Sequence, residues 1–567
     1  MIKIVGDIIG SDSLAVIKKL YKDTWSVSGN IGGMDSGARV NKIEDNKWQL
    51  KGSIGGYESV GIFQKIQEDI WSLKGDIGGF ISRAEIKKTS MGKWQLKGSI
   101  GGFNSVAEIL IPEQTEQKTK RDYESKISPH FDFSHPDNKS NARQEAVIIY
   151  QGQEPDRFRK SGRLYERSEH LDILQNRAEF HHGVENRIFE RYLRNCGKGL
   201  NVSSIGNSIL PVAKVQVTRE SLLELSEIPE VLAVMPDHEL HLIEPVNMPD
   251  IPVSLIEKND KMTWGIKRLE IPKLWETTKG RGAKVAVLDT GVYGDHPALK
   301  SRLKSFILID PMGRRINAKP SFDAASHGTH VCGTIAGGRD YQEVSIGVAP
   351  EASLFAAGIL LGGSTVATTI EGLVWAIEKG AGVINMSYGS NRYEPRYELI
   401  FRNLIENYDI LPVVSIGNSG LGNTGSPGNI ASAFSVGAFQ KGAENVDFIA
   451  PFSSGGSLVF PGDPHHEIIT KPDVAAPGVG VYSCIPPLKN SHEEQYAYQS
   501  GTSMAAPHVS GVAALLMSAY PGARAKEIME VLKQTAVHPD GNKKRPDNRW
   551  GYGMINPAAA CKALSGV

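Results

Sequence analysis

The sequence predicts an α/β protein whose largest part is a parallel sheet with helices on both faces, preceded by a small α/β sandwich and an all-β repeat domain. Three observations predict this order: a 23-residue repeat over 1–111, mixed strand and helix patterns over 145–245, and apolar strand runs alternating with helical segments over 246–567. Because the chain has 567 residues and single cores stop growing near about 300, several domains are expected.

The composition is that of a folded chain without bulk charge. Apolar residues make up 40% and charged residues 22%, and 63 basic side chains balance 63 acidic ones. This balance gives no general basic field, so no nucleic-acid partner is expected. The N-terminus carries no basic and apolar leader, and no apolar run approaches the roughly 18 residues of a membrane span. We therefore expect a cytoplasmic protein with no membrane partner, although signal-free export would leave the same sequence.

Residues 1–111 contain five copies of a 23-residue unit. Four copies open with the pattern W-x-(L/V)-x-G-x-I-G-G, and the N-terminal copy begins with Ile2 and keeps only the second glycine, Gly10. The tryptophans that open the other copies are Trp25, Trp48, Trp71 and Trp94. Apolar and polar residues alternate within a unit, and Gly-Gly permits a tight reversal, so each unit predicts a β-hairpin.

A single hairpin is marginally stable, so the five hairpins must share one core. The sequence leaves open whether they stack as a solenoid or close into a barrel. We interpret the tryptophans as core residues, and the alternative is an aromatic row that binds a ligand. The repeats are expected to form a recognition or regulatory module, with a protein partner or activator as ligand.

Residues 112–144 are polar and charged with few aliphatic side chains, which predicts a linker. Residues 145–245 combine strand and helix patterns in the order β-α-β-α-β, which is typical of a small sandwich. The strands are expected at Ala146–Tyr150, Ile209–Val217 and Val231–Met235, and the helices at Leu164–Leu193 and Arg219–Glu227.

The region 246–567 alternates apolar runs with helical segments, which predicts a parallel sheet covered on both faces. The strands are expected at Ala283–Leu288, Ser353–Ala357, Val383–Met386 and Leu411–Ile416, and the helices at Thr365–Lys379, Tyr397–Tyr408 and Met504–Met517.

Three short motifs in this region carry candidate catalytic residues in the order Asp, His, Ser. Asp289 ends a buried apolar run in D-T-G, His327 opens H-G-T-H, and Ser503 stands in G-T-S-M-A-A-P where a helix is expected to begin. A buried carboxylate is costly unless a cation such as an imidazolium offsets its charge. Free N–H groups at a helix start favour developing negative charge. Together the three motifs indicate a serine nucleophile activated by histidine.

With these motifs, the segment from about Trp264 to Ala563 resembles the subtilisin family of serine proteases. The resemblance implies a subtilisin-like fold in which Asn418 supplies a side-chain donor to the oxyanion. It also implies that V-I-N-M-S-Y-G lines the specificity pocket and pairs with the substrate backbone. The substrate-binding residues that it implies are Ser387, Tyr388, Gly389, Ser415, Ile416 and Gly417.

The roles that the resemblance implies define a reaction on a protein or peptide substrate. Ser503 Oγ attacks the scissile carbonyl, His327 takes and later returns the proton, and Asp289 orients the imidazole. Asn418 Nδ2 and the Ser503 backbone N–H are expected to bind the oxyanion.

The α/β sandwich resembles the pro-segment of this family, which inhibits the protease in product-like fashion. The match is good over Leu232–Asp237, whereas the long charged helix departs from the usual pattern. The resemblance implies a pro-segment bound in cis, with Glu239–Glu244 extended in the active-site cleft and a first cut near Ile243. The alternative is a packing domain without inhibitory function.

Specificity and cofactors leave weaker signals. The segments 387–389, 415–417 and 425–428 contain no Asp or Glu, so no strict Arg or Lys preference is expected. Tyr388 replaces the smaller residue common in the family and is expected to narrow the neighbouring subsite. Cys332 is interpreted as a packing residue rather than a reactive thiol. No HExxH or EF-hand pattern occurs, and the loop from Gly337 to Gly347 lacks the family's calcium-binding insertion, so neither metal nor cofactor is expected.

The favoured function is that of a serine endopeptidase, made as a self-inhibited zymogen, with the repeats as a recognition or regulatory module. One alternative makes the repeat domain a binding or assembly protein whose protease part serves only self-maturation. Another keeps the acyl-enzyme but transfers it to an amine, as a peptide transferase or cyclase does.

Overall fold

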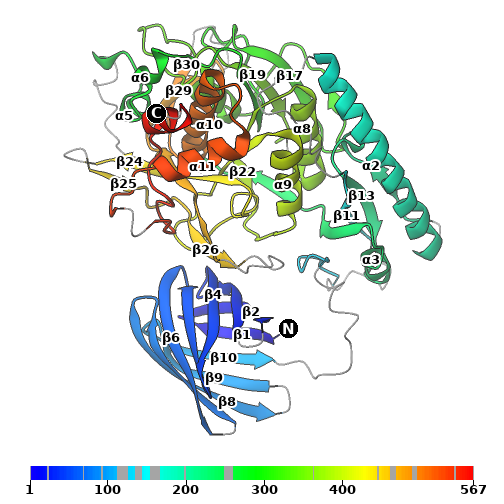
Figure 1. Cartoon of the computed structure of the whole chain (residues 1–567), viewed down its shortest axis with the longest axis vertical. Helices are drawn as coiled ribbons and strands as arrows, with labels where there is room; N and C mark the ends of the chain where they lie inside the picture. The colour runs from blue at the N-terminus through cyan, green and yellow to red at the C-terminus, as the bar shows by residue number, and fades with distance from the viewer. Residues whose placement is uncertain are drawn as a thin grey trace.

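The computed structural model describes residues 2–21, 24–67, 69–90, 93–110, 126–133, 143–153, 167–196, 199–247, 259–361, 363–442, 446–459, 468–487, 495–541 and 545–565. These residues form a β-barrel, a small α/β sandwich and a large α/β domain, and Figure 1 shows the barrel against one end of the large domain and the sandwich along its side. Among the helices described, none combines the length and hydrophobicity that crossing a bilayer requires.

The five repeats close into one antiparallel barrel. Its first strand pairs with the second and also with the last, so the sheet has no free edge, and this closure excludes a solenoid. The strands are β1 Ile2–Ile8, β2 Ser11–Tyr21, β3 Thr24–Ile31, β4 Met34–Glu44, β5 Lys47–Ile54, β6 Tyr57–Gln67, β7 Ile70–Ile77, β8 Phe80–Ser90, β9 Lys93–Ile100 and β10 Phe103–Leu110.

A ring of serine hydroxyls joins each repeat to the next. The N–H at the first position of each turn donates to a serine of the preceding unit; Ser36 accepts from Gly55 at 2.9 Å, for example. The last serine returns to the first unit, where Ile9 N donates to Ser105 Oγ at 3.1 Å. The remaining members of the ring are Ser13 to Gly32, Ser59 to Gly78 and Ser82 to Gly101. The ring satisfies turn N–H groups that the sheet ladder leaves unpaired.

The sandwich consists of a four-stranded sheet in the order β12-β13-β11-β14, with two helices on one face. Its elements are β11 Gln144–Tyr150, α2 Arg167–Cys196, β12 Val202–Ser204, the 3₁₀ turn η1 Gly206–Ser208, β13 Val212–Val217, α3 Arg219–Ser226 and β14 Val231–Pro236. Ala146, Ile148 and Tyr150 belong to the cluster under α2 and α3, whereas Val147 and Ile149 belong to a cluster of the large domain. The apolar run on β11 is therefore continuous because both faces of the strand are buried.

The large domain has a nine-stranded sheet in the order β18-β17-β19-β16-β21-β23-β24-β25, with β28 beside β24. Its strands are β16 Lys284–Asp289, β17 Leu303–Ile309, β18 Arg315–Ile316, β19 Ser353–Gly358, β21 Val383–Met386, β23 Leu411–Ser415, β24 Phe434–Lys441, β25 Asp447–Ile449 and β28 Val474–Pro477. The pairs from β17 through β24 to β28 are parallel, and β18 and β25 are antiparallel. This confirms the α/β prediction for the region.

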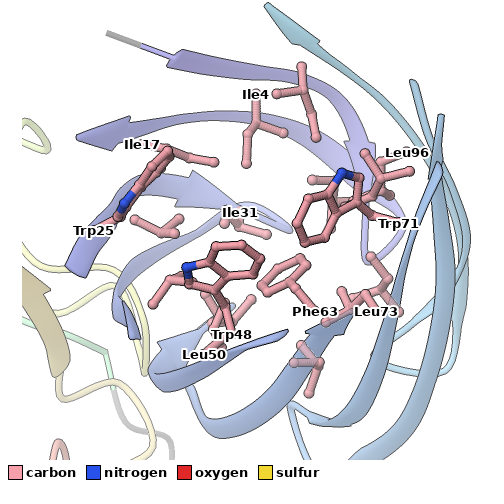
Figure 2. A pocket seen from close by; sticks show the side chains of 18 residues that line it. Ile4, Ile17, Trp25, Ile31, Trp48, Leu50, Phe63, Trp71, Leu73 and Leu96 are labelled. Carbon is pink, nitrogen blue, oxygen red and sulfur yellow. The ribbon is translucent and has the colours of Figure 1, made fainter. Parts of the chain in front are cut away.

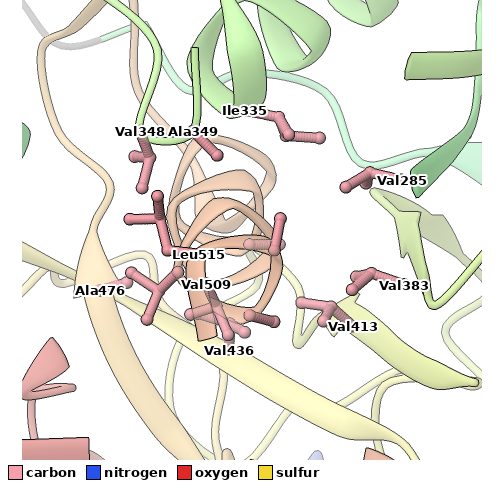
Figure 3. Packing of buried hydrophobic residues seen from close by; sticks show 14 of the residues in the cluster. Val285, Ile335, Val348, Ala349, Val383, Val413, Val436, Ala476, Val509 and Leu515 are labelled. Carbon is pink, nitrogen blue, oxygen red and sulfur yellow. The ribbon is translucent and has the colours of Figure 1, made fainter. Parts of the chain in front are cut away.

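Helices cover both faces of this sheet. They are α5 Trp264–Arg268, α6 Ile271–Trp275, α7 His327–Ala336, α8 Val366–Glu378, α9 Tyr397–Tyr408, α10 Thr502–Ala519, α11 Ala525–Thr535 and α12 Pro557–Leu564. Val509 and Leu515 of α10 pack onto Val285, Val413 and neighbouring strand residues, as Figure 3 shows. On β16, Leu288 points to the opposite face from Val285 and belongs to the cluster that includes α8 and α9.

Short strands complete the structure at the edges. They are β15 Glu239–Leu242, β20 Ser364–Thr365, β22 Tyr388–Gly389, β26 Gly456–Val459, β27 Ile468–Lys471, β29 Val481–Ile485 and β30 Gln495–Gln499. The strand β26 lies on the barrel, chiefly on β4 (Figure 1).

The structure differs from the linker prediction over residues 126–133. Ile127 bridges to Val234 of the sandwich, and Ser128 donates to the buried Glu394 of the large domain. Phe131 and Phe133 pack on the sandwich core. These few apolar residues stand between charged stretches and so were hidden in the average composition of 112–144.

Candidate active site

Three elements bring the candidate triad to one edge of the large sheet. Asp289 is the last residue of β16, His327 is the first of α7, and Ser503 is the second of α10. Carboxyl ends of neighbouring parallel strands meet at one edge of a sheet, which is where such sites form. All three side chains are buried.

Asp289 and His327 form a charge-assisted hydrogen bond. Asp289 Oδ1 lies 2.7 Å from His327 Nδ1 and also accepts from the N–H of Thr290 at 2.7 Å. Burial opposes the imidazolium, yet the Asp289 carboxylate holds the pKa of His327 above its ordinary value by charge and hydrogen bonding. The pair is therefore prepared to accept a proton at Nε2.

A second carboxylate supports this pair, and the sequence reasoning missed it. Asp323 accepts hydrogen bonds from Thr290 Oγ1 at 2.6 Å and from the N–H and hydroxyl of Thr329 at 2.7 and 2.6 Å. Thr290 Oγ1 in turn accepts from the N–H of Gly328. The two threonines belong to D-T-G and H-G-T-H, but an aspartate four residues before His327 carries no signal by itself.

A segment of the same chain lies in the cleft beside this pair. The strand β15 pairs antiparallel with β20 on one side and β22 on the other. His241 stands opposite Gly389 and Leu242 opposite Tyr388, and Ile243 N donates to the Ser387 carbonyl at 3.4 Å. Main-chain pairing on both sides is the way in which extended peptides are held by a sheet edge.

The nucleophile candidate contacts this segment directly. Ser503 Oγ donates to the Ile243 carbonyl at 3.1 Å and to the Ser387 carbonyl at 3.4 Å. Within the described part of the chain, His327 Nε2 is buried without a hydrogen-bond partner. The serine hydroxyl is thus directed at the bound segment and not at the imidazole.

Asn418 also contacts the segment, one carbonyl further along. Its Nδ2 donates to the Glu244 carbonyl at 2.9 Å, while its Oδ1 accepts from the N–H and hydroxyl of Thr502, both at 2.9 Å. Thr502 therefore orients the amide so that its N–H groups face the cleft. Val246 N donates to Ser500 O at 2.7 Å, so the chain continues past the serine.

The remaining predicted binding residues differ in their contacts. Ser387 and Gly389 meet the segment through their backbones, as described above. Gly417 N donates to Thr502 Oγ1 at 3.2 Å, and its φ of 118° favours glycine. Ser415 and Ile416 are fully buried at the end of β23, and among the described residues the Ser415 hydroxyl has no hydrogen-bond partner.

Tyr388 is buried while β15 occupies the cleft. Its ring is fully buried in the same apolar cluster as Leu240 of β15 and Tyr397 of α9. Burial raises the pKa of its hydroxyl. The ring therefore shares its cluster with a side chain of the segment in the cleft, and its effect on the neighbouring subsite stays a prediction.

Cys332 lies five residues after His327 on the same helix. Cys332 is fully buried on α7, and burial raises the pKa of its thiol well above the ordinary value, which keeps it protonated and suits packing. In the portion of the chain that the structure describes, no three His, Cys, Asp or Glu side chains gather as metal ligands.

Comparison with known proteins identifies relatives of the large domain. Residues 280–553 match the model of the subtilase family, peptidase S8. M-protease of Shouchella clausii is 34% identical over 358 residues, which cover 61% of this chain and 83% of that protein. Subtilisin Savinase of Lederbergia lenta is 35% identical over 303 residues, covering 53% of this chain and 98% of that protein.

Two further matches are to proteins of which this chain covers only part. Bacillopeptidase F of Bacillus subtilis is 31% identical over 385 residues, but the match spans 62% of this chain and only 26% of that protein. The crystal structure of fervidolysin, a keratinolytic enzyme of Fervidobacterium pennivorans related to subtilisin, superposes with a TM-score of 0.53 at 24% identity. It covers 74% of this chain and 61% of that one, and shows a shared fold.

Proposed function

Since this chain belongs to the subtilase family and is a subtilisin-like serine endopeptidase, we propose that it is made as a zymogen inhibited in cis by its own sandwich domain. The observation that carries the proposal is the position of residues 239–246 between β20 and β22, in contact with Ser503 and Asn418. The protease then matures by cutting this segment after Ile243.

The reaction follows from the positions of the side chains. Ser503 Oγ attacks the carbonyl carbon of the scissile bond and forms an acyl-enzyme, with its proton passing to His327 Nε2. The imidazolium is stabilised by Asp289 and returns the proton to the leaving amine. Asn418 Nδ2 donates to the oxyanion, and one such donor lowers the activation barrier by about 3 kcal/mol.

Three features of the site support a latent state before this reaction. Ser503 Oγ donates to the Ile243 carbonyl oxygen, so its lone pairs are not aimed at the carbon. His327 Nε2 has no hydrogen-bond partner within the described residues. Asn418 Nδ2 donates to Glu244 instead of Ile243. A small shift of the segment that brings the Ile243 carbonyl to Asn418 would make the bond reactive.

The sandwich is held in place by a carboxylate at a helix start. Asp237 Oδ1 accepts from the N–H of Ala367 in the first turn of α8 at 2.9 Å, and Asp237 pairs with Lys214 at 3.0 Å. A negative charge at this position satisfies free N–H groups and is favoured by the helix dipole. The sandwich sheet also packs its apolar face on α8 and α9.

The test is the processing of purified protein, followed by mass spectrometry and N-terminal sequencing. Wild-type protein should gain a new N-terminus at Glu244 or within the following residues to Met262, of which 248–258 lie outside the described residues. Ser503→Ala should remain intact. Asp237→Ala should be processed faster, whereas Glu220→Ala, which removes an exposed carboxylate from α3, should not change the rate. Active wild-type enzyme that keeps an uncut chain would contradict maturation at this segment.

We further propose that the barrel regulates the loop 420–428, which contains the predicted pocket segment 425–428. Asp35 Oδ2 accepts from the N–H of Thr424 at 3.0 Å and from its hydroxyl, and the N–H of Asp35 donates to Gly422. Thr424 stands between Asn418 and the pocket segment 425–428. Asn548 Nδ2 donates to the Gly56 carbonyl at 2.9 Å and adds a second attachment.

Removal of the barrel and removal of one attachment test this role separately. A variant that lacks residues 1–111 loses the barrel but keeps the segment 126–133. It should still hydrolyse an unstructured peptide, whereas it should no longer recognise its natural target or activator. Asp35→Ala should increase amide exchange over 420–424. Glu58→Ala occupies the equivalent position of the next repeat but is exposed, so it is the matched control. Unchanged exchange in Asp35→Ala would contradict the coupling.

A further inference from the structure

The barrel encloses an apolar cavity that the protease mechanism does not use. Its volume is about 320 Å³, within the range of small-molecule sites, and the side chains that line it are aliphatic or aromatic. Figure 2 shows Trp48, Trp71 and Phe63 pointing into this space from neighbouring strands. The lining side chains are Ile4, Ile8, Ile17, Trp25, Val27, Ile31, Val40, Trp48, Leu50, Ile54, Phe63, Trp71, Leu73, Ile77, Ile86, Leu96, Ile100 and Ile109.

The cavity exists because each repeat places small residues halfway along the barrel. Gly52 stands opposite Ala38, between the inward-facing Leu50 and Ile54. A Cβ at Gly52 would lie 2.6 Å from the Ala38 Cα, so the two strands approach too closely for a side chain at the glycine position. The equivalent pairs are Gly6 with Ala107, Gly29 with Ala15, Gly75 with Gly61, and Gly98 with Ala84. This ring of small pairs leaves an interior that the protein's own side chains do not fill.

One end of the barrel is closed. A ring of isoleucines before the turns is buried, and Ile54 and Ile77 are 5% and 2% exposed. Ile9 adds to the closure, because a Cβ at Gly32, Gly55 or Gly101 would come within 3.0, 3.1 or 3.2 Å of its side chain. Ile9 has a φ of 59°, which is strained for a β-branched residue. Ile9 thus closes this end of the barrel at an energetic cost.

The opposite end is partly open and carries lysines. Trp25, Trp48 and Trp71 are half-buried there, unlike the isoleucines at the closed end. Lys42 and Lys65 stand directly across the ladder from Trp48 and Trp71, so they share the inner face of the barrel. Lys88 repeats this position opposite Trp94.

These lysines differ in their pairing. Asp45 lies 2.7 Å from Lys42 Nζ, and Asp69 lies 3.4 Å from Lys88 Nζ. Among the described carboxylates, none forms an ion pair with Lys65, which is half-buried. An anion placed at the mouth would find this lysine available.

The dimensions favour a single extended chain. From Trp48 to Ile54, β5 rises about 20 Å, or roughly 15 Å along the barrel axis once strand tilt is included. A cavity of about 320 Å³ over that length is narrow. It suits one unbranched hydrocarbon chain better than a fused ring system or a folded peptide.

We propose that the barrel binds one long-chain aliphatic carboxylate, with the hydrocarbon chain in the cavity and the carboxylate at Lys65. The carboxylate remains at the mouth because burying it among apolar side chains would be costly without partners. The hydrocarbon chain can enter without rearrangement of the protein, since apolar cavities of this kind stay dry and accept apolar ligands. The site is separate from the catalytic residues and does not depend on the zymogen proposal.

Calorimetric titration of full-length Ser503→Ala protein tests the site without self-cleavage. The probes are octanoate, decanoate and dodecanoate below their micelle concentrations, with dodecanol and dodecyltrimethylammonium as uncharged and cationic partners. Affinity should rise about fourfold for each added methylene until the cavity is full. Dodecanoate should bind about two- to fivefold more tightly than dodecanol.

Two kinds of variant separate the chain from the head group. Lys65→Gln should remove the preference for the carboxylate and leave dodecanol binding unchanged. Lys74→Gln removes the same charge from the outer face of β7 and should change neither. Ala84→Leu fills the middle of the cavity and should weaken all probes by at least tenfold. If that variant misfolds, the lysine pair still provides the test.

Four outcomes would overturn the proposal. They are absence of binding to any free probe, affinity that does not change with chain length, tighter binding of the cation than of the carboxylate, and equal effects of Lys65→Gln and Lys74→Gln. A further arm uses phosphatidylglycerol vesicles. Binding to vesicles without binding to free carboxylates would assign the surface to a membrane and reject the cavity ligand.

Discussion

The barrel and the catalytic domain distribute their structural roles in different ways. In the barrel each role has five equivalent holders, as with the serine ring in which Ser36 and Ser59 accept the same bond one repeat apart. In the catalytic domain each role belongs to one residue, and no second carboxylate could replace Asp289 at 2.7 Å from His327. Repetition therefore builds a closed shape, whereas chemistry needs residues that are unlike their neighbours.

The departures from repetition are where the barrel becomes specific. Gly37 replaces the Val60, Arg83 and Val106 of later repeats, and a Cβ there would lie 2.7 Å from Ser457 O of β26. Asp35 is attached to Thr424, whereas Glu58 at the equivalent position is exposed. The second repeat thus supplies Asp35 and Gly37 to the interface with the catalytic domain, and Gly56 of the third repeat adds the hydrogen bond from Asn548.

The largest expected effect separates unique from repeated residues. Asp289→Asn should lower kcat by about 10⁴-fold, because the imidazole loses its orienting anion and its correct tautomer. Ser59→Ala in the barrel should leave kcat on a short peptide unchanged. Steady-state kinetics provides the measurement, after both variants have been processed in trans by an immobilised protease that is then removed. Comparable losses in the two variants would remove the distinction between the two regions.

The next effect compares a filled core with a hollow one. Ala513 lies fully buried in α10, and Ala513→Leu should destabilise the catalytic domain by about 1–3 kcal/mol through overpacking. Ala84→Leu adds the same atoms to the barrel, where the cavity has room, and should be neutral or stabilising. Urea unfolding followed by separate signals for each domain tests this. A loss of stability in Ala84→Leu equal to that in Ala513→Leu would show that the barrel interior is filled.

A smaller effect measures one member of the serine ring. Ser59→Ala leaves the buried N–H of Gly78 without its acceptor and should cost about 1 kcal/mol of barrel stability. Gln64→Ala on the same strand is exposed and serves as control. The double variant Ser59→Ala with Ser82→Ala should cost about twice as much. If neither Ser59→Ala nor the double variant lowered the stability of the barrel, water would have replaced the missing hydroxyl.

The smallest effect concerns pH, and the two docked domains should respond with opposite signs. Burial lowers the pKa of His238 at the sandwich interface against the pull of Glu394, and Arg392 and His130 lower it further. The docked state therefore binds fewer protons, and docking of the sandwich should weaken as pH falls below the ordinary value of 6.5.

At the barrel interface the sign is reversed. Burial raises the pKa of Asp35 against two hydrogen bonds from Thr424. Docking of the barrel should strengthen as pH falls through that raised value toward 3.8. Amide exchange at about pH 7 and pH 5, divided by the intrinsic exchange rate at each pH, should rise on acidification over 239–246 and fall or stay constant over 420–424. Exchange that rises equally in both segments would indicate general acid loosening.

The candidate site could largely be predicted because its signals are local. D-T-G, H-G-T-H and G-T-S-M-A-A-P each carry their residue at the end of a strand or the start of a helix, and the assignment to a subtilisin-like serine protease is confirmed by the family match. Asp323 was not predicted, because its partners Thr290 and Thr329 are brought to it only by folding. The sequence predicts Tyr388 at a subsite, and the structure adds that its ring lies in one apolar cluster with Leu240 of the segment in the cleft.

The sequence by itself determined the period of the repeats, the hairpin in each one, and the alternation of strands and helices in the large domain, because these depend on neighbours a few residues apart. Only the tertiary structure decided that β1 meets β10, that the interior of the resulting barrel stays hollow, and that Asp35 meets Thr424. Those outcomes depend on how strands twist and how closely surfaces approach over the whole molecule, and no local alternation of side chains records such distances.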